Sequence, residues 1–233
     1  MSKNYAFIFA RGGSKGIPRK NIKLFNGKPL IAYSILLAQN MSEIKKVFVS
    51  TDDDEIEKIA KQYSADVIKR PQDLATDTAS EYDAWRHAIL YLQECNDNFD
   101  RFISLPTTSP LRNKNDIQKT IECLDNTTDF VITITNTNHS PYFNMVQKIN
   151  DNVKLMLDSE DTVVRRQDAP KAFNITTVAY AAHVQSILNK KSIFDGEVKY
   201  VEIPEERAID IDTPLDFDIA AFLYNRRTNF NER

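Results

Sequence analysis

The sequence predicts an α/β fold built around a largely parallel sheet, and two observations lead to that prediction. Short apolar runs alternate with segments of helical periodicity along most of the 233 residues. Strands that alternate with helices form right-handed βαβ units and a largely parallel sheet. Four of the five glycines fall within the first 27 residues, which indicates one specialised turn after the first apolar run. This length suits a single domain, residues 1–233, with a modest insertion.

Hydrophobic periodicity assigns each element of the first half in turn. Short apolar runs, several of them rich in β-branched residues, predict strands, and apolar positions at helical spacing predict helices. The expected strands are 5–10, 46–50, 65–68, 101–105 and 130–135, and the expected helices are 29–40, 53–63, 78–94 and 114–124.

The regular alternation loosens between about residues 136 and 190. β-Rich material inside an α/β chain is typical of a lid, an arm or a contact between subunits, so we expect an insertion there. The sheet pattern then returns before a closing helix. The expected elements are a hairpin from 142–149 and 153–157, strands at 178–182, 199–203 and 207–211, and helices at 183–189 and 213–226.

The composition excludes several classes of protein. A formal net charge of −3, with 27% charged residues, provides no basic field for nucleic acid. Cys95 and Cys123 belong to no metal-ligand pattern, so we expect two reduced thiols rather than a disulfide or a zinc site. The sequence shows neither a secretory signal nor an apolar stretch of transmembrane length. We therefore expect a soluble cytoplasmic protein that binds neither nucleic acid nor membrane.

Residues 10–21, ARGGSKGIPRKN, place three glycines and four basic residues directly after the first expected strand. Glycine lets the main chain approach an anion and adopt positive φ, so that successive N–H groups converge on its oxygens. Lys and Arg supply the compensating charge. The spacing matches neither the P-loop nor the dinucleotide fingerprint. A phosphate site and a structural turn between strand and helix therefore both stay open.

A second candidate site lies near the C-terminus, in residues 209–212 (IDID). Side chains alternate between the faces of a strand, so Asp210 and Asp212 would point the same way, about 7 Å apart. Two such carboxylates can flank one hard cation. Thr213 as N-cap and Pro214 at the first helical position would begin the next helix. The carboxylates would then lie at a strand's carboxyl end, where open α/β sheets bind ligands; helix capping is the alternative.

Three other polar segments are ambiguous. We interpret residues 52–55 (DDDE) as the solvated start of a helix, although one carboxylate could face a nucleotide crevice. Residues 106–112 offer hydroxyls for a pocket, or form a proline-stiffened loop with a capping residue. Arg165 and Arg166 are either solvated or include a bidentate partner for a substrate carboxylate. The three histidines have no partner at metal-ligand spacing and are interpreted as structural.

Taken together, six ordered motifs resemble the CMP-sugar synthetases, specifically the acylneuraminate (nonulosonic acid) cytidylyltransferases, over nearly the whole chain. The motifs are 10–21 (ARGGSKGIPRKN), 29–31 (PLI), 77–80 (DTAS), 108–112 (TSPLR), 166–170 (RQDAP) and 209–214 (IDIDTP). The resemblance implies a Rossmann-like three-layer domain of the nucleotide-diphospho-sugar transferase type, with a β-rich dimerisation insertion. It also implies transfer of a cytidylyl group from CTP to a 2-keto sugar acid, with Mg²⁺ as cofactor and Mn²⁺ as the alternative.

The same resemblance carries residue roles onto matching positions. Arg11, Lys20 and Asp212 would be catalytic, and Asp210 and Asp212 would bind the metal. The family is dimeric, so we expect a homodimer in which the insertion reaches the partner's site. The nucleotide-binding residues would be Arg11, Gly12, Ser14, Lys20, Asn21, Arg70 and Ser80, and the sugar-binding residues Thr108, Arg166, Gln167, Tyr180 and Phe194.

One departure from the family pattern concerns the acceptor. Sialic-acid members carry Gln before Pro-Thr-Ser-Pro, whereas Pro106 stands at that place here and offers no side-chain amide. The expected acceptor is N-acetylneuraminate or a relative such as legionaminate, and this departure argues for a relative, legionaminate or pseudaminate, over N-acetylneuraminate itself. Two other hypotheses stay open, namely another sugar nucleotidyltransferase of the same superfamily and a catalytically silent nucleotide-binding module.

Overall fold

The protein is described by a computed structural model, in which residues 2–157 and 165–231 are placed well enough to describe. The strands are β1 (Asn4–Phe9), β2 (Leu24–Phe25), β3 (Lys28–Pro29), β4 (Ile44–Thr51), β5 (Asp66–Lys69), β6 (Arg101–Ser104), β7 (Phe130–Asn136), β8 (Val146–Ile149), β9 (Asn152–Leu155), β10 (Phe173–His183) and β11 (Val198–Glu202). The α-helices are α1 (Leu30–Gln39), α2 (Asp54–Gln62), α3 (Glu81–Glu94), α4 (Lys114–Cys123), α5 (Val184–Asn189) and α6 (Pro214–Asn231).

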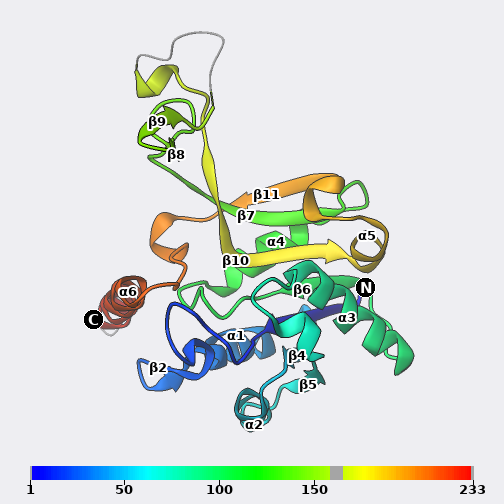
Figure 1. The fold of residues 1–233 in the computed structure, drawn as a ribbon. Coiled ribbons are helices and arrows are strands. Elements are labelled where there is room, and N and C mark those ends of the chain that lie inside the picture. The colour runs from blue at the N-terminus through cyan, green and yellow to red at the C-terminus, as the bar shows by residue number, and fades with distance from the viewer. Residues whose placement is uncertain (1, 158–164, 232–233) are drawn as a thin grey trace.

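Seven of the described strands form one sheet in the order β11-β7-β10-β6-β1-β4-β5. β10 runs antiparallel to both neighbours, and the other pairs are parallel. The prediction of a largely parallel, mixed sheet is therefore confirmed. Because the parallel strands end at one edge, the loops after β1, β4, β5 and β6 gather there (Figure 1).

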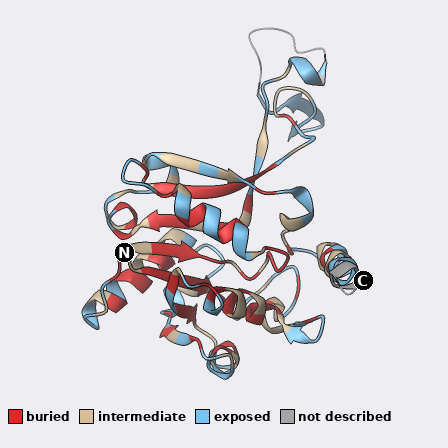
Figure 2. Cartoon of the chain, turned by 180° about the vertical axis from the view of Figure 1, so that it is seen from behind, coloured by how far each residue is buried: buried red, intermediate tan, exposed pale blue. Residues whose placement is uncertain are grey.

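Helices cover both faces of this sheet, which gives three layers. On β1, Ala6 and Ile8 join the core beneath α1, α2 and α4. The alternate residues Tyr5 and Phe7 join an aromatic core beneath α3 and α5, where Phe7 stacks on Phe102 at 4.5 Å between ring centroids. Because successive side chains of a strand point to opposite faces of the sheet, the one apolar run of β1 contributes residues to both cores. Figure 2 shows that the buried residues are concentrated in the sheet and on the helix faces packed against it.

A third cluster joins segments that are distant in sequence and lies beside the sheet edge. Ile17 from the glycine-rich loop and Ile211 from the acidic segment are both buried in it, together with Leu30 of α1 and Ala220 of α6. This packing fixes the two candidate site segments against each other.

The expected strand at 207–211 is wrong. A 3-10 turn occupies Glu205–Arg207, and the guanidinium of Arg207 is held by the buried carboxylate of Asp116 in α4, with an N–O distance of 2.9 Å. The backbone N–H of Ile211 donates to the Thr108 carbonyl at 2.9 Å, so this segment pairs with a loop instead of with a strand. The side chains of residues 209–212 still alternate as predicted, because the isoleucines pack in the third cluster and the aspartates face the opposite side.

The insertion is narrower than the expected 136–190. β10 and α5 belong to the main body, since β10 pairs with β6 and β7 in the central sheet. What projects from the body, here called the arm (residues 137–157 and 165–172), contains the expected hairpin as β8 and β9. Figure 1 shows the arm standing away from the three-layer body, and Figure 2 shows it largely exposed.

Candidate active site

A cleft of about 460 Å³ lies at the carboxyl edge of the parallel strands, which is where open α/β sheets bind ligands. The loop after β1 forms one wall, and the segments 70–81 and 106–108 form others. The segment 210–212 closes it from the far end of the chain. Nine predicted site residues line this cleft: Arg11, Ser14, Lys20, Asn21, Arg70, Ser80, Thr108, Asp210 and Asp212.

The glycines of the first loop serve close packing. A Cβ built on Gly16 would lie 2.0 Å from the backbone oxygen of Asp212, and one on Gly12 would lie 2.6 Å from Oδ2 of Asp53. Neither glycine adopts positive φ; Arg19 is the residue of this loop in the left-handed region, with φ of 55°. The loop is therefore glycine-rich chiefly because two acidic segments pack directly on its backbone.

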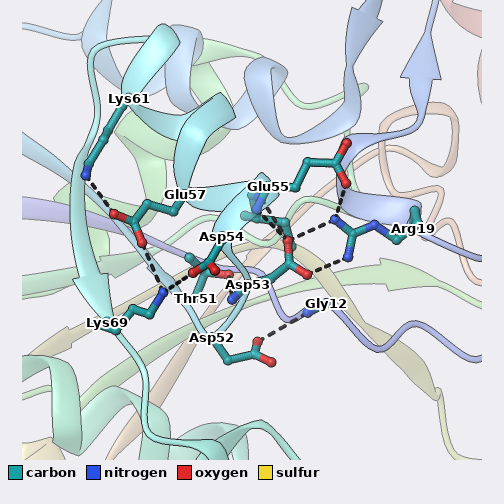
Figure 3. Close-up of polar contacts among 11 residues, drawn as sticks. Gly12, Arg19, Thr51, Asp52, Asp53, Asp54, Glu55, Glu57, Lys61 and Lys69 are labelled. Atoms are coloured by element: carbon teal, nitrogen blue, oxygen red, sulfur yellow. Dashed lines mark hydrogen bonds and ion pairs between the residues drawn. The ribbon is translucent and has the colours of Figure 1, made fainter.

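The acidic residues after β4 hold this loop in place (Figure 3). Asp53 caps α2 by accepting from the N–H groups of Glu55 and Ile56, and it also binds the Arg19 guanidinium at 2.5 and 2.9 Å. Asp52 accepts from the Gly12 N–H at 3.2 Å. The Arg19 hydrogen bond is the main cause that lowers the pKa of Asp53 to about 2. The interpretation of 52–55 as a helix start is thus correct for Asp53 but omitted its second role.

Four cations and four carboxylates face the cleft. The cations are Arg11, Lys15, Lys20 and Arg70, and the carboxylates are Asp77, Glu81, Asp210 and Asp212. Arg11 and Lys15 both pair with Asp77, at 2.9 and 3.0 Å, and this pairing, chiefly with Lys15, lowers the pKa of Asp77. These pairs are exposed, so water screens them and a more highly charged anion can replace Asp77.

Arg70 is the buried cation of the cleft. Its guanidinium bonds the Ser50 hydroxyl and carbonyl, at 3.2 and 2.6 Å, and lies 5.4 Å from the centre of the Phe9 ring. Burial lowers its pKa, and within the described residues it forms no ion pair with a carboxylate. A buried positive charge held by neutral groups attracts any anionic or electron-rich ligand in the cleft.

Lys20 joins the glycine-rich loop to the acidic segment. Its amine donates to the Ile211 carbonyl at 2.7 Å and to the Asp212 carboxylate at 2.9 Å. The Lys20 side chain is 13% exposed, whereas that of Asp212 is 71% exposed. The lysine is therefore fixed by the backbone contact, while the Asp212 carboxylate keeps access to solvent and to a ligand.

Asp210 lies deeper than Asp212 in the same cleft. Burial raises its pKa, and the neighbouring negative charge of Asp212 raises it further. Its Oδ1 is buried and has no hydrogen-bond partner among the described residues. A carboxylate oxygen without a hydrogen-bond partner, next to a second carboxylate, is a suitable ligand for a hard cation. Asp210 and Asp212 therefore fit a divalent metal ion.

The remaining wall of the cleft is neutral and polar. Asn21 is 7% exposed, and its amide joins the Arg11 carbonyl to the Thr107 hydroxyl, at 3.0 and 2.5 Å. The hydroxyls of Thr108 and Thr177 lie 3.1 Å apart. Asn21 thus positions the loops, while Thr108 and Thr177 present oxygen atoms to the cleft.

A family model described as cytidylyltransferase matches residues 5–227 of this sequence. The chain belongs to the cytidylyltransferase family. The CMP-N,N'-diacetyllegionaminic acid synthase of Campylobacter jejuni is 36% identical over 226 residues, which are 96% of this chain and 95% of that protein. The pseudaminic acid cytidylyltransferase of Campylobacter jejuni is 36% identical over 224 residues, which are 95% and 96% of the two chains.

Solved structures support the fold of this cytidylyltransferase. The CMP:2-keto-3-deoxy-manno-octonic acid synthetase complexed with CTP superposes with a TM-score of 0.75. The match covers 97% of this chain and 100% of that one, at 17% identity. The predicted α/β nucleotidyltransferase architecture is therefore confirmed. Among the described residues, no helix combines the length and apolarity needed to cross a membrane.

Several predicted sugar-binding residues lie outside the cleft of their own chain. Gln167 is exposed in a 3-10 turn of the arm, Arg166–Asp168, and the side chain of Arg166 lies outside the described part. Tyr180 packs beside Trp85, with 5.7 Å between ring centroids, and burial raises its pKa to about 12. Phe194 is 66% exposed in the turn between α5 and β11. The cytidylyltransferase cleft therefore brings together both metal candidates and every nucleotide candidate except Gly12, but only Thr108 of the sugar candidates.

Thr177 and Glu81 are among the residues of this cytidylyltransferase cleft that the sequence reasoning did not name as site residues. Thr177 reaches it because the register of β10 against β7 shifts between Thr176 and Tyr180, and such bulges redirect side chains. Glu81 begins α3 and is open to the cleft, yet the protein atoms around its carboxyl raise its pKa. The bulge leaves no local signal in the sequence, whereas Glu81 directly follows the 77–80 motif and could have been found from it.

Proposed function

We propose that this protein transfers the cytidylyl group of CTP to a nonulosonic sugar acid, giving a CMP-sugar acid and pyrophosphate. The observation that carries the proposal is the meeting of Arg11 and Lys20 with Asp210 and Asp212 in one cleft. Cations for a triphosphate and carboxylates for a metal are the parts that nucleotidyl transfer needs. Membership of the cytidylyltransferase family supports the choice of CTP.

The reaction proceeds by in-line displacement at the α-phosphorus. The anomeric hydroxyl of the sugar acid forms the new O–P bond and loses its proton, and the bond to the bridging oxygen breaks as pyrophosphate leaves. Arg11 and Lys20 hold the phosphate oxygens and neutralise the charge that builds on them, so catalysis rests on positioning and electrostatics. The hydrogen bond to the Ile211 carbonyl would hold the Lys20 amine in place while its ionic partner changes from the Asp212 carboxylate to a phosphate oxygen.

Asp210 and Asp212 are proposed to hold one Mg²⁺ or Mn²⁺ ion. Proteins commonly bind magnesium through one or two carboxylates, and water and phosphate oxygens would supply the remaining ligands. When bound, such an ion polarises the phosphate and can lower the pKa of a coordinated hydroxyl. The Oδ1 atom of Asp210, which is buried without a hydrogen-bond partner among the described residues, would then have a partner.

The nucleoside is assigned to the opposite wall. Arg70 is proposed to contact the cytosine, with Ser80 beside it at the start of α3. The guanidinium is preorganised because Ser50 and Phe9 already fix its plane. The Gly12 and Ser14 part of the loop would approach the phosphates.

The acceptor is proposed to be a legionaminate- or pseudaminate-type acid in preference to N-acetylneuraminate. Pro106, which replaces the glutamine of sialic-acid members, lines the cleft, so a side-chain amide is absent from that position. The two relatives at 36% identity are named for legionaminic and pseudaminic acid. Thr108 and Thr177 then offer hydroxyls to this acceptor.

The arm is proposed to complete the site of a second copy in a homodimer. Its large apolar side chains are exposed, and clustered exposed apolar groups mark protein interfaces. Dimerisation would cover them and carry Arg166 and Gln167 to the partner's acceptor. The exposed apolar residues in or beside the arm are Met145, Val146, Ile149, Val153, Leu155, Met156, Leu157 and Ile175.

A cytoplasmic location is proposed because CTP is made and used there, and the free thiols of Cys95 and Cys123 suit that reducing compartment. The activity is tested by incubating the protein with CTP, Mg²⁺ and a panel of acids, namely N-acetylneuraminate, N,N'-diacetyllegionaminate, pseudaminate and 3-deoxy-manno-octulosonate. Pyrophosphate release should be fastest with one of the two diacylated acids. Release only with a sugar 1-phosphate would instead identify another nucleotidyltransferase of the superfamily, and CTP binding without turnover a silent module.

A further inference from the structure

A second cavity, of about 500 Å³, lies between α1, α6 and the loop that leads into α4. It shares no lining residue with the catalytic cleft. Tyr224 of α6 contacts Tyr33 of α1, and Phe217 of α6 contacts Phe25 of β2, so the cavity forms where the closing helix packs on the first one; Figure 1 shows α6 on the same side of the body as β2. None of the roles assigned above uses it.

Four cations line this second cavity: Lys28, Arg112, Lys114 and Arg227. Its lining contains no Asp or Glu. Within the described residues none of the four forms an ion pair, although ion pairs are common elsewhere on this chain. Four like charges on one hollow repel one another, so the arrangement favours an occupant that carries negative charge.

The rest of the second cavity is apolar and aromatic. Tyr33 and Tyr224 meet edge to face, with 5.5 Å between ring centroids, and Leu36 and Leu37 of α1 complete this wall. The Tyr33 hydroxyl is already used, because it donates to the Phe25 carbonyl at 2.6 Å. The wall therefore offers rings and methyl groups to the body of a ligand, while the cations take its charge.

Arg112 connects the two cavities. It is 5% exposed, and its Nε is buried without a hydrogen-bond partner in the described chain. Its other nitrogens donate to the Ser34 hydroxyl at 2.9 Å, to the Thr177 carbonyl at 3.2 Å and to the Pro106 carbonyl. Pro106 and Thr177 line the catalytic cleft on its acceptor side. A charge placed beside Arg112 thus acts on a residue that holds the acceptor wall.

We propose that the second cavity is a regulatory site for a small organic anion, with a carboxylate or phosphate group attached to an apolar or aromatic body. The occupant's charge pairs with Lys28, Lys114 and Arg227, and its body lies against Tyr33 and Tyr224. Through Arg112 it changes the affinity for the sugar acid more than the affinity for CTP.

Binding is tested by calorimetry on the full-length protein saturated with CTP and Mg²⁺, so that the catalytic cleft is filled. The probe is phenyl phosphate, with inorganic phosphate as the charge-only control and phenol as the ring-only control. One site should bind phenyl phosphate more tightly than either control. Lys28→Glu/Lys114→Glu should weaken the binding by about tenfold or more, because two charge-assisted contacts become repulsive.

A matched variant, Lys58→Glu/Lys119→Glu, makes the same charge change at exposed lysines outside the cavity and should bind the probe like wild type. Leu36→Trp, which fills the cavity without altering charge, should also abolish binding. Saturating phenyl phosphate should change the KM for the sugar acid in wild type but not in the Lys28/Lys114 variant. Equal binding by the two double variants, loss of binding when CTP is present, or an unchanged KM would overturn the proposal.

Discussion

The cleft and the arm of this cytidylyltransferase are built in opposite ways. In the cleft most charged groups have a partner within the chain, as Lys20 has in Ile211 and Asp212 and Arg11 has in Asp77. Three apolar clusters lie beneath these groups. On the arm, β8 and β9 are exposed along their whole length, apolar residues included. A cleft of this kind can bind nucleotide within one chain, whereas the arm has an apolar surface that the described part of its own chain leaves uncovered.

The largest effect should come from the carboxylates proposed to bind the metal, and replacing one of them tests whether this cleft catalyses the reaction. Asp212→Asn should lower kcat by about 100-fold or more, because a cation ligand is lost while the exposed position tolerates an amide. Asp218→Asn, an exposed carboxylate in the first turns of α6, is the matched control and should keep full activity. Full Mg²⁺-dependent turnover by Asp212→Asn would remove this residue from the metal site.

Lys20→Ala should raise the KM for CTP by about 10- to 100-fold, the usual cost of losing a hydrogen bond to a charged group. The KM for the sugar acid should change much less, because Lys20 lies on the loop side of the cleft. Lys23→Ala, close by in sequence but absent from the cleft lining, provides the comparison. Steady-state kinetics with each substrate varied in turn make the measurement, and unchanged CTP kinetics would exclude Lys20 from the triphosphate site.

Mixing two inactive variants tests whether the arm serves a partner's cleft. Asp212→Asn has an impaired cleft and an intact arm, and Arg166→Ala/Gln167→Ala has the reverse. If the arm acts across the dimer, an equimolar mixture regains about one quarter of wild-type activity, because half of the dimers are hybrids with one intact site of two. An arm that acts on its own chain gives no recovery in the mixture, and sedimentation verifies that hybrids form.

The smallest effect concerns the ion pair between Arg19 and Asp53, which holds the glycine-rich loop against the start of α2. Asp53→Asn keeps the helix cap but loses the charge, so at pH 7 it should lower the free energy of unfolding by about 1 kcal/mol, given that the pair is partly exposed. The folded-state pKa of Asp53 is lowered to about 2 from 3.8, so this stabilisation is present above pH 4 and declines as the pH falls towards 2. Urea unfolding at pH 7, 4 and 3 checks it, and a constant difference would refute the ion pair.

Local patterns predicted the body well and its connections less well. The alternation in β1 and the helical spacing of α1 are local signals, and both elements appear within a residue or two of their expected bounds. The segment 207–211 looks like a strand by the same rule, but Arg207 is drawn to Asp116, 91 residues away in sequence. Sequence periodicity contains no information about such a partner.

The residues of the candidate site also fall into two groups, those found from local sequence motifs and those that depend on contacts distant in sequence. Arg11, Lys20 and Asp212 stand in motifs that the sequence displays, and the structure brings them together. Thr177 depends on a register shift in β10, and the clamp of Arg19 by Asp53 depends on a left-handed residue at 19. Tyr180 lies in a strand as expected, but its ring faces the aromatic core, because which face of a strand meets a cleft is fixed by the neighbouring strands.

The most direct test of the account is to follow the phosphorus atoms of the reaction. ³¹P NMR of a mixture of CTP, Mg²⁺ and N,N'-diacetyllegionaminate or pseudaminate should show loss of CTP. Equal amounts of pyrophosphate and a new CMP phosphodiester should appear with wild type and not with Asp212→Asn. Release of inorganic phosphate alone, or no phosphodiester with any nonulosonic acid, would contradict cytidylyl transfer in this cleft.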